Sequence, residues 1–243
     1  MIGTSGGTPT LSIIIPILNE EECLPALMRD IDDCIENVDF PLECIIVDGN
    51  SEDSSVEICK RHNLRVVVSP RGRGQQLVAG AQHASGEIFL FLHADCRLTP
   101  DHCLTAVKVV QHNDVVAGGF RLRFDDSHPV LRFAEKINLI RFRLTKIIYG
   151  DHGLFIRKQT YETVGGFSAQ SLFEDVDFSR KLKKAGRVVL TSPEMVTSAR
   201  RFRKGGVIRT YLKMASLHIL HWISVSPEYL AQLYRNERRK KEE

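Results

Sequence analysis

The chain has 243 residues, of which 43% are hydrophobic, so it is long and apolar enough to bury one sizeable core. Charged residues make up 26%, close to the globular average, which excludes wholesale disorder. The net charge is only +3, from 33 Lys and Arg against 30 Asp and Glu, and such a balance gives no support for nucleic-acid binding.

The termini and the cysteines indicate a cytoplasmic protein. Residues 1–10 are rich in Gly, Thr and Ser, so we expect a flexible N-terminus without the charge and apolar pattern of a secretory signal. None of the six cysteines forms a Cys-x-x-Cys pair, which favours small buried side chains over a disulfide framework or a zinc site. No apolar run approaches the roughly 20 residues that span a bilayer.

The first part of the chain predicts strands and helices in alternation. Asn19 is expected to cap the first helix. The expected strands are Leu11–Leu18, Leu42–Val47, Leu64–Val68 and Ile88–Leu92, and the expected helices are Glu20–Ile35, Ser54–His62 and Gln75–Ala84. Short right-handed connections of this kind predict an open, mostly parallel sheet with helices on both faces.

Polar clusters follow three of these strands: Asn19-Glu20, Asp48-Gly49-Asn50 and His93-Ala94-Asp95. Ligands of open α/β sheets bind outside the carboxyl ends of the strands. We therefore expect a ligand site at this edge.

The second part is less regular. It predicts helices at Pro100–His112, Pro129–Arg143, Thr160–Val164 and Glu174–Ala185, strands at Val115–Phe124, Leu154–Arg157 and Val188–Leu190, and closing helices at Gly206–Ile223 and Pro227–Arg239. Two segments, Arg200–Lys204 and Arg238–Lys241, are locally basic. Solvated surface is the plain interpretation of both. For Arg200, Arg201 and Arg203, closure over the phosphates of a ligand is an equal alternative.

Several segments, in this order, resemble the family 2 glycosyltransferases: Ser12–Glu20 (SIIIPILNE), Ile46–Asp53 (IVDGNSED), Phe91–Asp95 (FLHAD), Gly165–Phe167 (GGF) and Phe173–Asp177 (FEDVD). A small bacterial branch, labelled radical-SAM/seleno-domain-associated, is suggested by Gly72–Gln76, Tyr149–Phe155, Thr197–Arg201 and Val225–Leu230. The resemblance covers nearly the whole chain.

This resemblance implies a single GT-A-like, Rossmann-related α/β domain over 11–243, with a mostly parallel central sheet, flanking helices and C-terminal helices. Residues 11–98 would be the nucleotide-binding half, 99–205 the acceptor and catalytic half, and 206–240 the C-terminal helices. The implied activity is inverting transfer of a sugar from a nucleotide-diphosphate sugar, UDP-linked by family habit, to an acceptor hydroxyl, with Mg²⁺ or Mn²⁺ assisting the leaving diphosphate.

The resemblance places the donor at the sheet edge. Asp95 is the expected metal ligand, although the family's Asp-x-Asp motif has His93 as its first member here. Asp48 and Glu20 are expected at the nucleotide, with a turn residue and a helix-dipole charge as the alternatives. The remaining expected donor contacts are the main chain near Pro16 and Leu18, and the side chains of Arg73 and Gln76.

The Glu-Asp pair of the resemblance falls on Glu174 and Asp175, with Asp175 as the base that takes the acceptor proton. The alternative is a run of acids at a helix N-terminus, which stabilises the helix dipole. Expected on the acceptor side are Asp151, His152, Gly165, Gly166 and Asp177.

Two other functions remain open: a nucleotidyltransferase and a non-catalytic nucleotide-sugar-binding protein. The first needs a Gly-rich loop with a Lys after the first strand, where Ile17–Glu20 stands instead. The second rests on His93 replacing an acid. The basic amphipathic segment Val207–Ile223 either packs on the core or makes peripheral contact with the inner face of a membrane.

Overall fold

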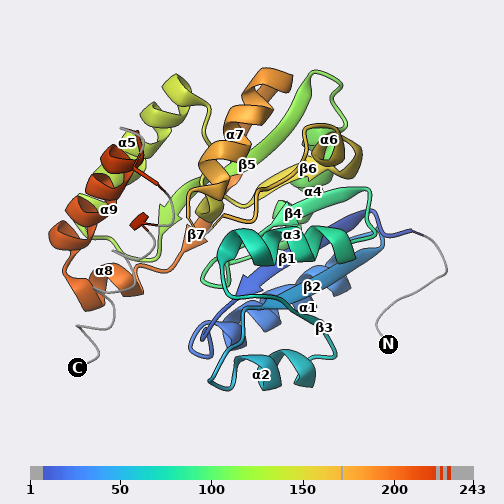
Figure 1. Cartoon of the computed structure of the whole chain (residues 1–243). Coiled ribbons are helices and arrows are strands. Elements are labelled where there is room, and N and C mark those ends of the chain that lie inside the picture. The colour runs from blue at the N-terminus through green and yellow to red at the C-terminus, as the bar shows by residue number, and fades with distance from the viewer. Residues whose placement is uncertain (1–7, 171, 223–224, 227–228, 231–243) are drawn as a thin grey trace.

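The computed structural model of the chain describes residues 8–170, 172–222, 225–226 and 229–230 (Figure 1). Its strands are β1 (Leu11–Ile17), β2 (Leu42–Asp48), β3 (Arg65–Val68), β4 (Ile88–Phe91), β5 (Val115–Phe124), β6 (Leu154–Arg157) and β7 (Arg187–Thr197). Its helices are α1 (Leu24–Asn37), α2 (Ser55–Arg61), α3 (Arg73–His83), α4 (Pro100–Val110), α5 (Pro129–Thr145), the 3₁₀ turn η1 (Gly150–His152), α6 (Lys158–Thr163), α7 (Glu174–Ala185), α8 (Arg200–Gly205) and α9 (Val207–Trp222).

The strands form one sheet in the order β3-β2-β1-β4-β6-β5-β7. All neighbours pair in parallel except β6, which is antiparallel to both β4 and β5. Ile17 pairs with Asp48, and Ile14 pairs with Phe91, so the segments that follow β1, β2 and β4 emerge at one edge. The expected α/β class with a mostly parallel sheet is confirmed.

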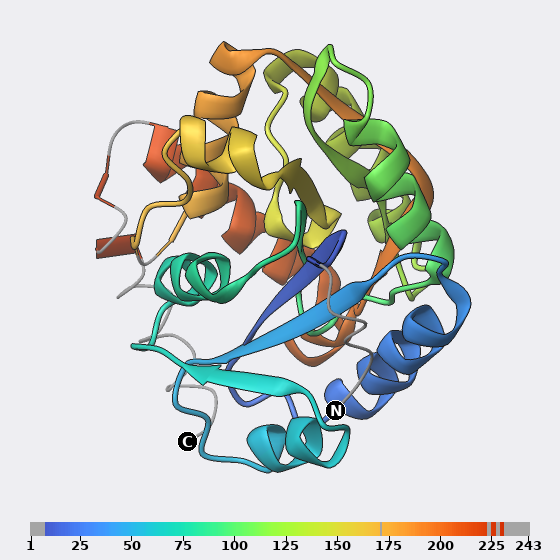
Figure 2. The same cartoon turned by 90° about the vertical axis from the view of Figure 1, so that its right-hand side faces the viewer.

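Helices cover both faces of the sheet (Figures 1 and 2). On one face, β1 side chains such as Ile13 and Ile15 pack with α1, α2 and α4. On the other face, Ile14 and Phe89 pack with α3, α6 and α7. Gly80 lets α3 approach closely, because an added Cβ would lie only 2.3 Å from a methyl of Ile14. The continuous apolar run of β1 is therefore explained by burial on both faces.

The first helix begins later than expected. α1 starts at Leu24, and Asn19 adopts a left-handed φ of 54° instead of capping it. The Asn19 amide oxygen accepts a hydrogen bond from the Glu52 backbone N–H, at 2.8 Å, so the residue joins two loops. The prediction of an Asn19 cap was wrong, because a contact between loops uses the side chain.

The strand expected at Val188–Leu190 is longer, since β7 extends to Thr197. Its pairing with β5 shifts register between Phe120 and Arg121, beside the cis bond of Ser192–Pro193. Proline is tolerated on edge strands and at bulges, and Pro193 lies on the edge strand β7 at this irregularity. The basic segment after β7 forms a short helix, α8, which the sequence pattern did not indicate.

Two helices close the described part of the chain. Leu217 and Leu220 of α9 pack with Tyr149, Phe173 and Val176. Most of the expected closing helix Pro227–Arg239 lies outside the described residues, as do residues 1–7 of the expected flexible N-terminus. No helix in the described ranges has the length and apolarity needed to cross a membrane.

Candidate functional site

The loops that follow β1 and β2 are joined to each other. The backbone N–H of Glu20 donates to Ser55 Oγ at 2.8 Å, and that of Asn19 donates to Ser51 Oγ at 3.0 Å. In the same way, the Glu21 N–H donates to the Asp53 carboxylate at 3.1 Å. These three hydrogen bonds hold the two loops together at the carboxyl edge of the sheet.

Asp48 and Gln76 hold the strand ends. The Asp48 carboxylate is almost fully buried and accepts the N–H groups of Asn50 and Ser51, at 3.1 and 3.0 Å. Gln76, also buried, donates from Nε2 to the carbonyls of Ile17 at 2.7 Å and Val47 at 2.8 Å. Both side chains thus lie at the predicted edge; the Asp48 contacts are those of the turn residue given as its alternative, whereas the Gln76 partners were not indicated by the sequence.

Glu20 and Asp95 meet two arginines of α8. Arg200 forms an ion pair with Glu20, and Arg201 lies 3.9 Å from Asp95 Oδ2 and 4.0 Å from Glu20 Oε1. Burial raises the pKa of Glu20, while Arg200 opposes that rise. Segments about 180 residues apart therefore meet beside β1 and β4. Pro16 and Leu18, the expected main-chain contacts, are half-buried on the same strand end.

His93, two residues before Asp95, lies against the turn at Gly150. Its ring packs against Gly150 so closely that a Cβ on this glycine would lie 2.3 Å from Nε2. Burial, and then the nearby Arg73 guanidinium, lower the pKa of His93 to about 4. The imidazole is therefore neutral at neutral pH, the form that can bind a cation.

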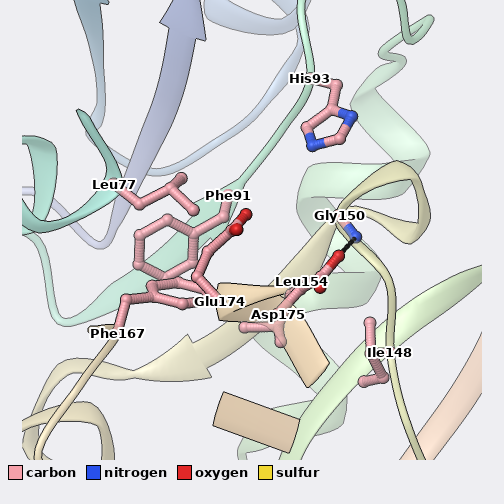
Figure 3. A pocket seen from close by; sticks show the side chains of 9 residues that line it. All are labelled: Leu77, Phe91, His93, Ile148, Gly150, Leu154, Phe167, Glu174 and Asp175. Atoms are coloured by element: carbon pink, nitrogen blue, oxygen red, sulfur yellow. Dashed lines mark hydrogen bonds between the residues drawn. The ribbon is translucent and has the colours of Figure 1, made fainter. Parts of the chain in front are cut away.

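The acidic pair at the start of α7, Glu174 and Asp175, shares a small pocket with His93. Leu77, Phe91 and Phe167 also line this pocket (Figure 3). Asp175 Oδ2 accepts the Gly150 N–H at 2.9 Å, the bond drawn in Figure 3, and lies 3.4 Å from Arg73 Nη2. The expected base thus faces the pocket, with one oxygen oriented by the loop before β6.

Glu174 is 0% exposed and forms an ion pair with Arg73. Burial raises the pKa of Glu174, whereas the Arg73 charge lowers it. Arg73 was expected at the donor; here it holds the two acids of α7, and their charges raise its own pKa. Its neighbour Gly74 lets α3 lie close to the segment before α7, since an added Cβ would lie 2.4 Å from the carbonyl oxygen of Gln170.

Three buried polar atoms near this pocket have no hydrogen-bond partner among the described residues: Glu174 Oε2, Asp151 Oδ1 and His152 Nε2. Because a carbonyl only accepts, His152 Nδ1–H donates to the Phe120 oxygen, at 2.7 Å. Nε2 therefore carries a lone pair, 3.9 Å from the Asp151 carboxylate. Burial lowers the pKa of His152, which keeps the ring neutral.

The other acceptor-side residues do not line the pocket. Asp177 Oδ1 accepts from Arg180 at 2.8 Å and Oδ2 accepts from Gln170 at 3.1 Å. Gly165 and Gly166, both with positive φ, turn the chain after α6, and Lys181 donates to the Gly166 carbonyl at 3.0 Å. Their turn precedes Phe167, which does reach the pocket.

One supporting contact was missed from the sequence. The Arg141 guanidinium of α5 stacks on the Tyr149 ring at 3.7 Å and donates to the Ile147 carbonyl at 3.0 Å. These contacts brace the residues just before Gly150. Arg141 in an apolar helix and the following Tyr149 are both visible in the sequence. Their contact could not be predicted, because no rule pairs residues that are eight positions apart across a turn.

The sheet edge fits a minimal divalent-cation site. Among the described residues, no group of three or more His, Cys, Asp or Glu side chains is placed to hold a metal. Asp95 offers one carboxylate beside the neutral His93, and Mg²⁺ or Mn²⁺ often takes only one or two protein carboxylates together with substrate phosphates and water. Asp95 and His93 therefore suit a cation that binds together with a diphosphate.

Comparison with known proteins agrees with this geometry. An undecaprenyl-phosphate 4-deoxy-4-formamido-L-arabinose transferase from Pseudomonas syringae pv. syringae (strain B728a) is 30% identical over 155 residues, covering 60% of this chain and 46% of that protein. The corresponding transferase of Sodalis glossinidius (strain morsitans) is 31% identical, with 60% and 48% covered. The chain spans about half the length of these curated relatives.

Solved structures share the fold. The mannosyltransferase PcManGT from Pyrobaculum calidifontis, in complex with GDP-Man and Mn²⁺, gives a TM-score of 0.60 at 21% identity, covering 93% of this chain and 73% of that one. S. aureus TarS 1-349 gives 0.63 at 18% identity, covering 91% and 68%. The profile of the family described as "Glycosyl transferase family 2" matches residues 12–170. The chain therefore belongs to glycosyl transferase family 2.

Proposed function

We propose that this enzyme transfers a sugar, with inversion, from a nucleoside-diphosphate sugar to an acceptor oxygen in the pocket that Asp175 faces. The observation that carries the proposal is the juxtaposition of Asp95, His93 and Asp175. His93 and Asp175 line the same pocket, Asp95 follows His93 by two residues, and Arg73 pairs with the acids of α7. A leaving diphosphate at Asp95 and a base at Asp175 would thus stand on opposite sides of one small space.

The donor would lie along residues 11–98. Asp48, Glu20, Pro16 and Leu18 line the strand ends where a nucleotide would bind, and the joined loops leave little to reorganise. A UDP donor is favoured by the family resemblance, and the related TarS structure was solved with UDP-GlcNAc. Arg73 and Gln76 would border the diphosphate, with Gln76 acting through the carbonyls it holds.

A divalent cation, Mg²⁺ or Mn²⁺, would be held by Asp95 with His93 beside it, and would neutralise the diphosphate charge as the sugar leaves. The neighbouring α8 arginines would add positive charge at the same place. Solved relatives of the fold, PcManGT among them, contain Mn²⁺.

The acceptor would enter from the side of residues 99–205. Asp175 would take the proton of an acceptor hydroxyl, while Gly150 keeps its carboxylate oriented and Glu174 anchors Arg73. Asp151 and His152 border this side, with Gly165, Gly166 and Asp177 shaping the loop and helix behind it. The curated relatives are named for undecaprenyl-phosphate, a lipid phosphate that is already ionised and would need no base.

The test is Asp175→Asn, with Asp177→Asn as the matched control on the same helix. If the acceptor is a hydroxyl, the first variant should lose about 10²–10⁴ in kcat with donor affinity retained, because a positioned base contributes that much. The control should turn over like the unaltered enzyme, since Asp177 points to Arg180 and Gln170. Unchanged turnover in Asp175→Asn would reject Asp175 as the base.

Cytoplasmic location, with peripheral contact to the inner face of a membrane through α9, is part of the same proposal, as is membership of the radical-SAM/seleno-domain-associated branch. A nucleotidyltransferase is less favoured, because the loop after β1 has Asn19 and Glu20 where a Gly-rich loop with Lys is needed. A non-catalytic binder would fail to hydrolyse or transfer any donor sugar, which separates it from an enzyme in one assay.

A further inference from the structure

Helix α5 has two apolar faces, and only one of them is buried. Leu131, Ala134 and Phe142 face the interior. The second face is a row of large apolar side chains at helical spacing of four, three and four residues, which lies on the opposite side of the helix. It consists of Phe133, Ile137, Ile140 and Leu144, which are 62%, 38%, 51% and 75% exposed.

Helix α9 lies beside α5 on the same side of the molecule (Figure 1) and contacts it. It also has an exposed apolar pair one turn apart, Ile208 and Leu212, 64% and 63% exposed. We call these six side chains the α5/α9 apolar surface. A helix at a protein surface normally exposes polar residues, so several large exposed apolar side chains on two adjacent helices mark a contact surface.

The charge around this surface has one sign. Residues 129–146 and 207–222, which make up these two helices, contain seven of the 33 Lys and Arg but only one of the 30 Asp and Glu, Glu135. Glu135 is paired with Arg132 at 2.6 Å. Arg141 faces inward and stacks on Tyr149. Lys136, Arg143 and Arg209 are exposed, and none of them is in an ion pair within the described ranges.

We propose that the α5/α9 apolar surface docks on the headgroup region of an anionic lipid bilayer. The membrane contact proposed above used α9 alone, and here the contact includes α5 as well. This inference rests on the proposed function, because a sugar transferase that acts on a membrane-bound acceptor needs such a contact. Apolar rows flanked by Lys and Arg are the composition of helices that lie in a membrane interface. A second copy of this chain is disfavoured, because a two-fold contact would press the same cations against each other.

The surface is connected directly to the pocket. Arg141, on α5, stacks on Tyr149, and the inner face of α9 packs on Tyr149 and Val176. Tyr149 precedes Gly150, which orients Asp175. A bilayer on the outer faces of α5 and α9 would thus lie about one helix diameter, roughly 10 Å, from the loop that holds the base. Such a distance suits an acceptor whose reactive group stands at the headgroup level.

The test is flotation of the full chain with vesicles of phosphatidylcholine alone or with about one third phosphatidylglycerol. We expect binding only to the anionic vesicles, weakened by salt. Phe133→Ser with Leu144→Ser should lower the partition at least about tenfold, because both side chains would leave the interface. Val68→Ser is the matched control, since Val68 is 66% exposed on β3, at the edge strand of the sheet.

A second variant, Lys136→Glu with Arg143→Glu, should remove the preference for anionic vesicles while the thermal unfolding temperature stays the same. The proposal is overturned if the unaltered chain ignores anionic vesicles, binds both kinds equally, or binds unchanged after the Phe133 and Leu144 substitutions. It is equally overturned if those substitutions instead dissociate a dimer. Hydrolysis of a nucleotide sugar, measured without lipid, separates the two proposals: activity without vesicle binding rejects only the docking surface.

Discussion

The ion pair between Arg73 and Glu174 gives a sharp prediction for Arg73→Met. Glu174 is 0% exposed, and this variant would leave its carboxylate buried without a counter-charge. Breaking a fully buried pair costs about 3–5 kcal/mol. Because the Arg73 side chain is 33% exposed, solvent screens part of the interaction and we expect a loss of about 2 kcal/mol. For a chain of this size that lowers the melting temperature by about 4–8 °C.

A double variant tests the cause. Glu174→Gln keeps the shape of the side chain and removes its charge, so Arg73→Met with Glu174→Gln should recover more than half of the lost stability. The free energy of unfolding, from urea titration of the four proteins, measures this directly. If the double variant is as unstable as Arg73→Met alone, packing rather than charge explains the loss, and our reasoning is refuted.

The pH dependence has a defined sign. Burial raises the pKa of Glu174 above its ordinary 4.5, and loss of Arg73 removes the charge that opposes this rise. A carboxyl with a raised folded pKa binds more protons in the folded state, so stability is lost as pH rises from 4.5 through that pKa. The deficit of Arg73→Met should therefore be larger at pH 7 than at pH 5, and the double variant should lack this difference.

Three further predictions concern the rest of the site. Gly150→Ala should cost about 1–3 kcal/mol and disturb His93, because the new Cβ would lie 2.3 Å from that ring; an unchanged melting temperature would contradict the contact. Burial lowers the pKa of His152, so as pH drops below about 6.5 the unfolded state takes up a proton that the folded state does not, and the free energy of unfolding falls. His152→Gln lacks this group, so between pH 7 and pH 5 its free energy of unfolding, from urea titration, should fall less than that of the unaltered protein, by up to about 1.4 kcal/mol per pH unit. Asp95→Ala should abolish the Mn²⁺ dependence of donor binding in calorimetry, and a dependence equal to that of the unaltered enzyme would exclude Asp95 as the ligand.

The sheet and its ligand edge could be predicted because local signals agree there. Buried runs such as Ile13–Ile17 permit little besides a central strand, and polar residues follow three of these strands. Strand direction is different, because it depends on how a connection folds back. The long connection through α5 brings the chain back so that β6 runs antiparallel to β4 and β5, and no residue of Leu154–Arg157 indicates that direction.

Site residues could be placed on their elements but not paired with their partners. Arg73 was expected at a phosphate since it opens a helix after a Gly, yet its partners stand 101 and 102 residues later. Asp48 satisfies both interpretations, because it lies at the ligand edge and caps its own turn. The sequence predicted a helix at Pro129–Arg143 but not the outward position of its second apolar row, because periodicity identifies a helix and not which of its faces packs on the core.

The missing side chain at Gly74 limits how this enzyme can be remodelled. Even a methyl group there would press on the Ser168 and Gln170 carbonyls, which lie 2.6 and 2.4 Å from its position. Helix α3 and the segment before α7 therefore cannot be altered independently, and random mutagenesis at residue 74 should return almost only inactive clones.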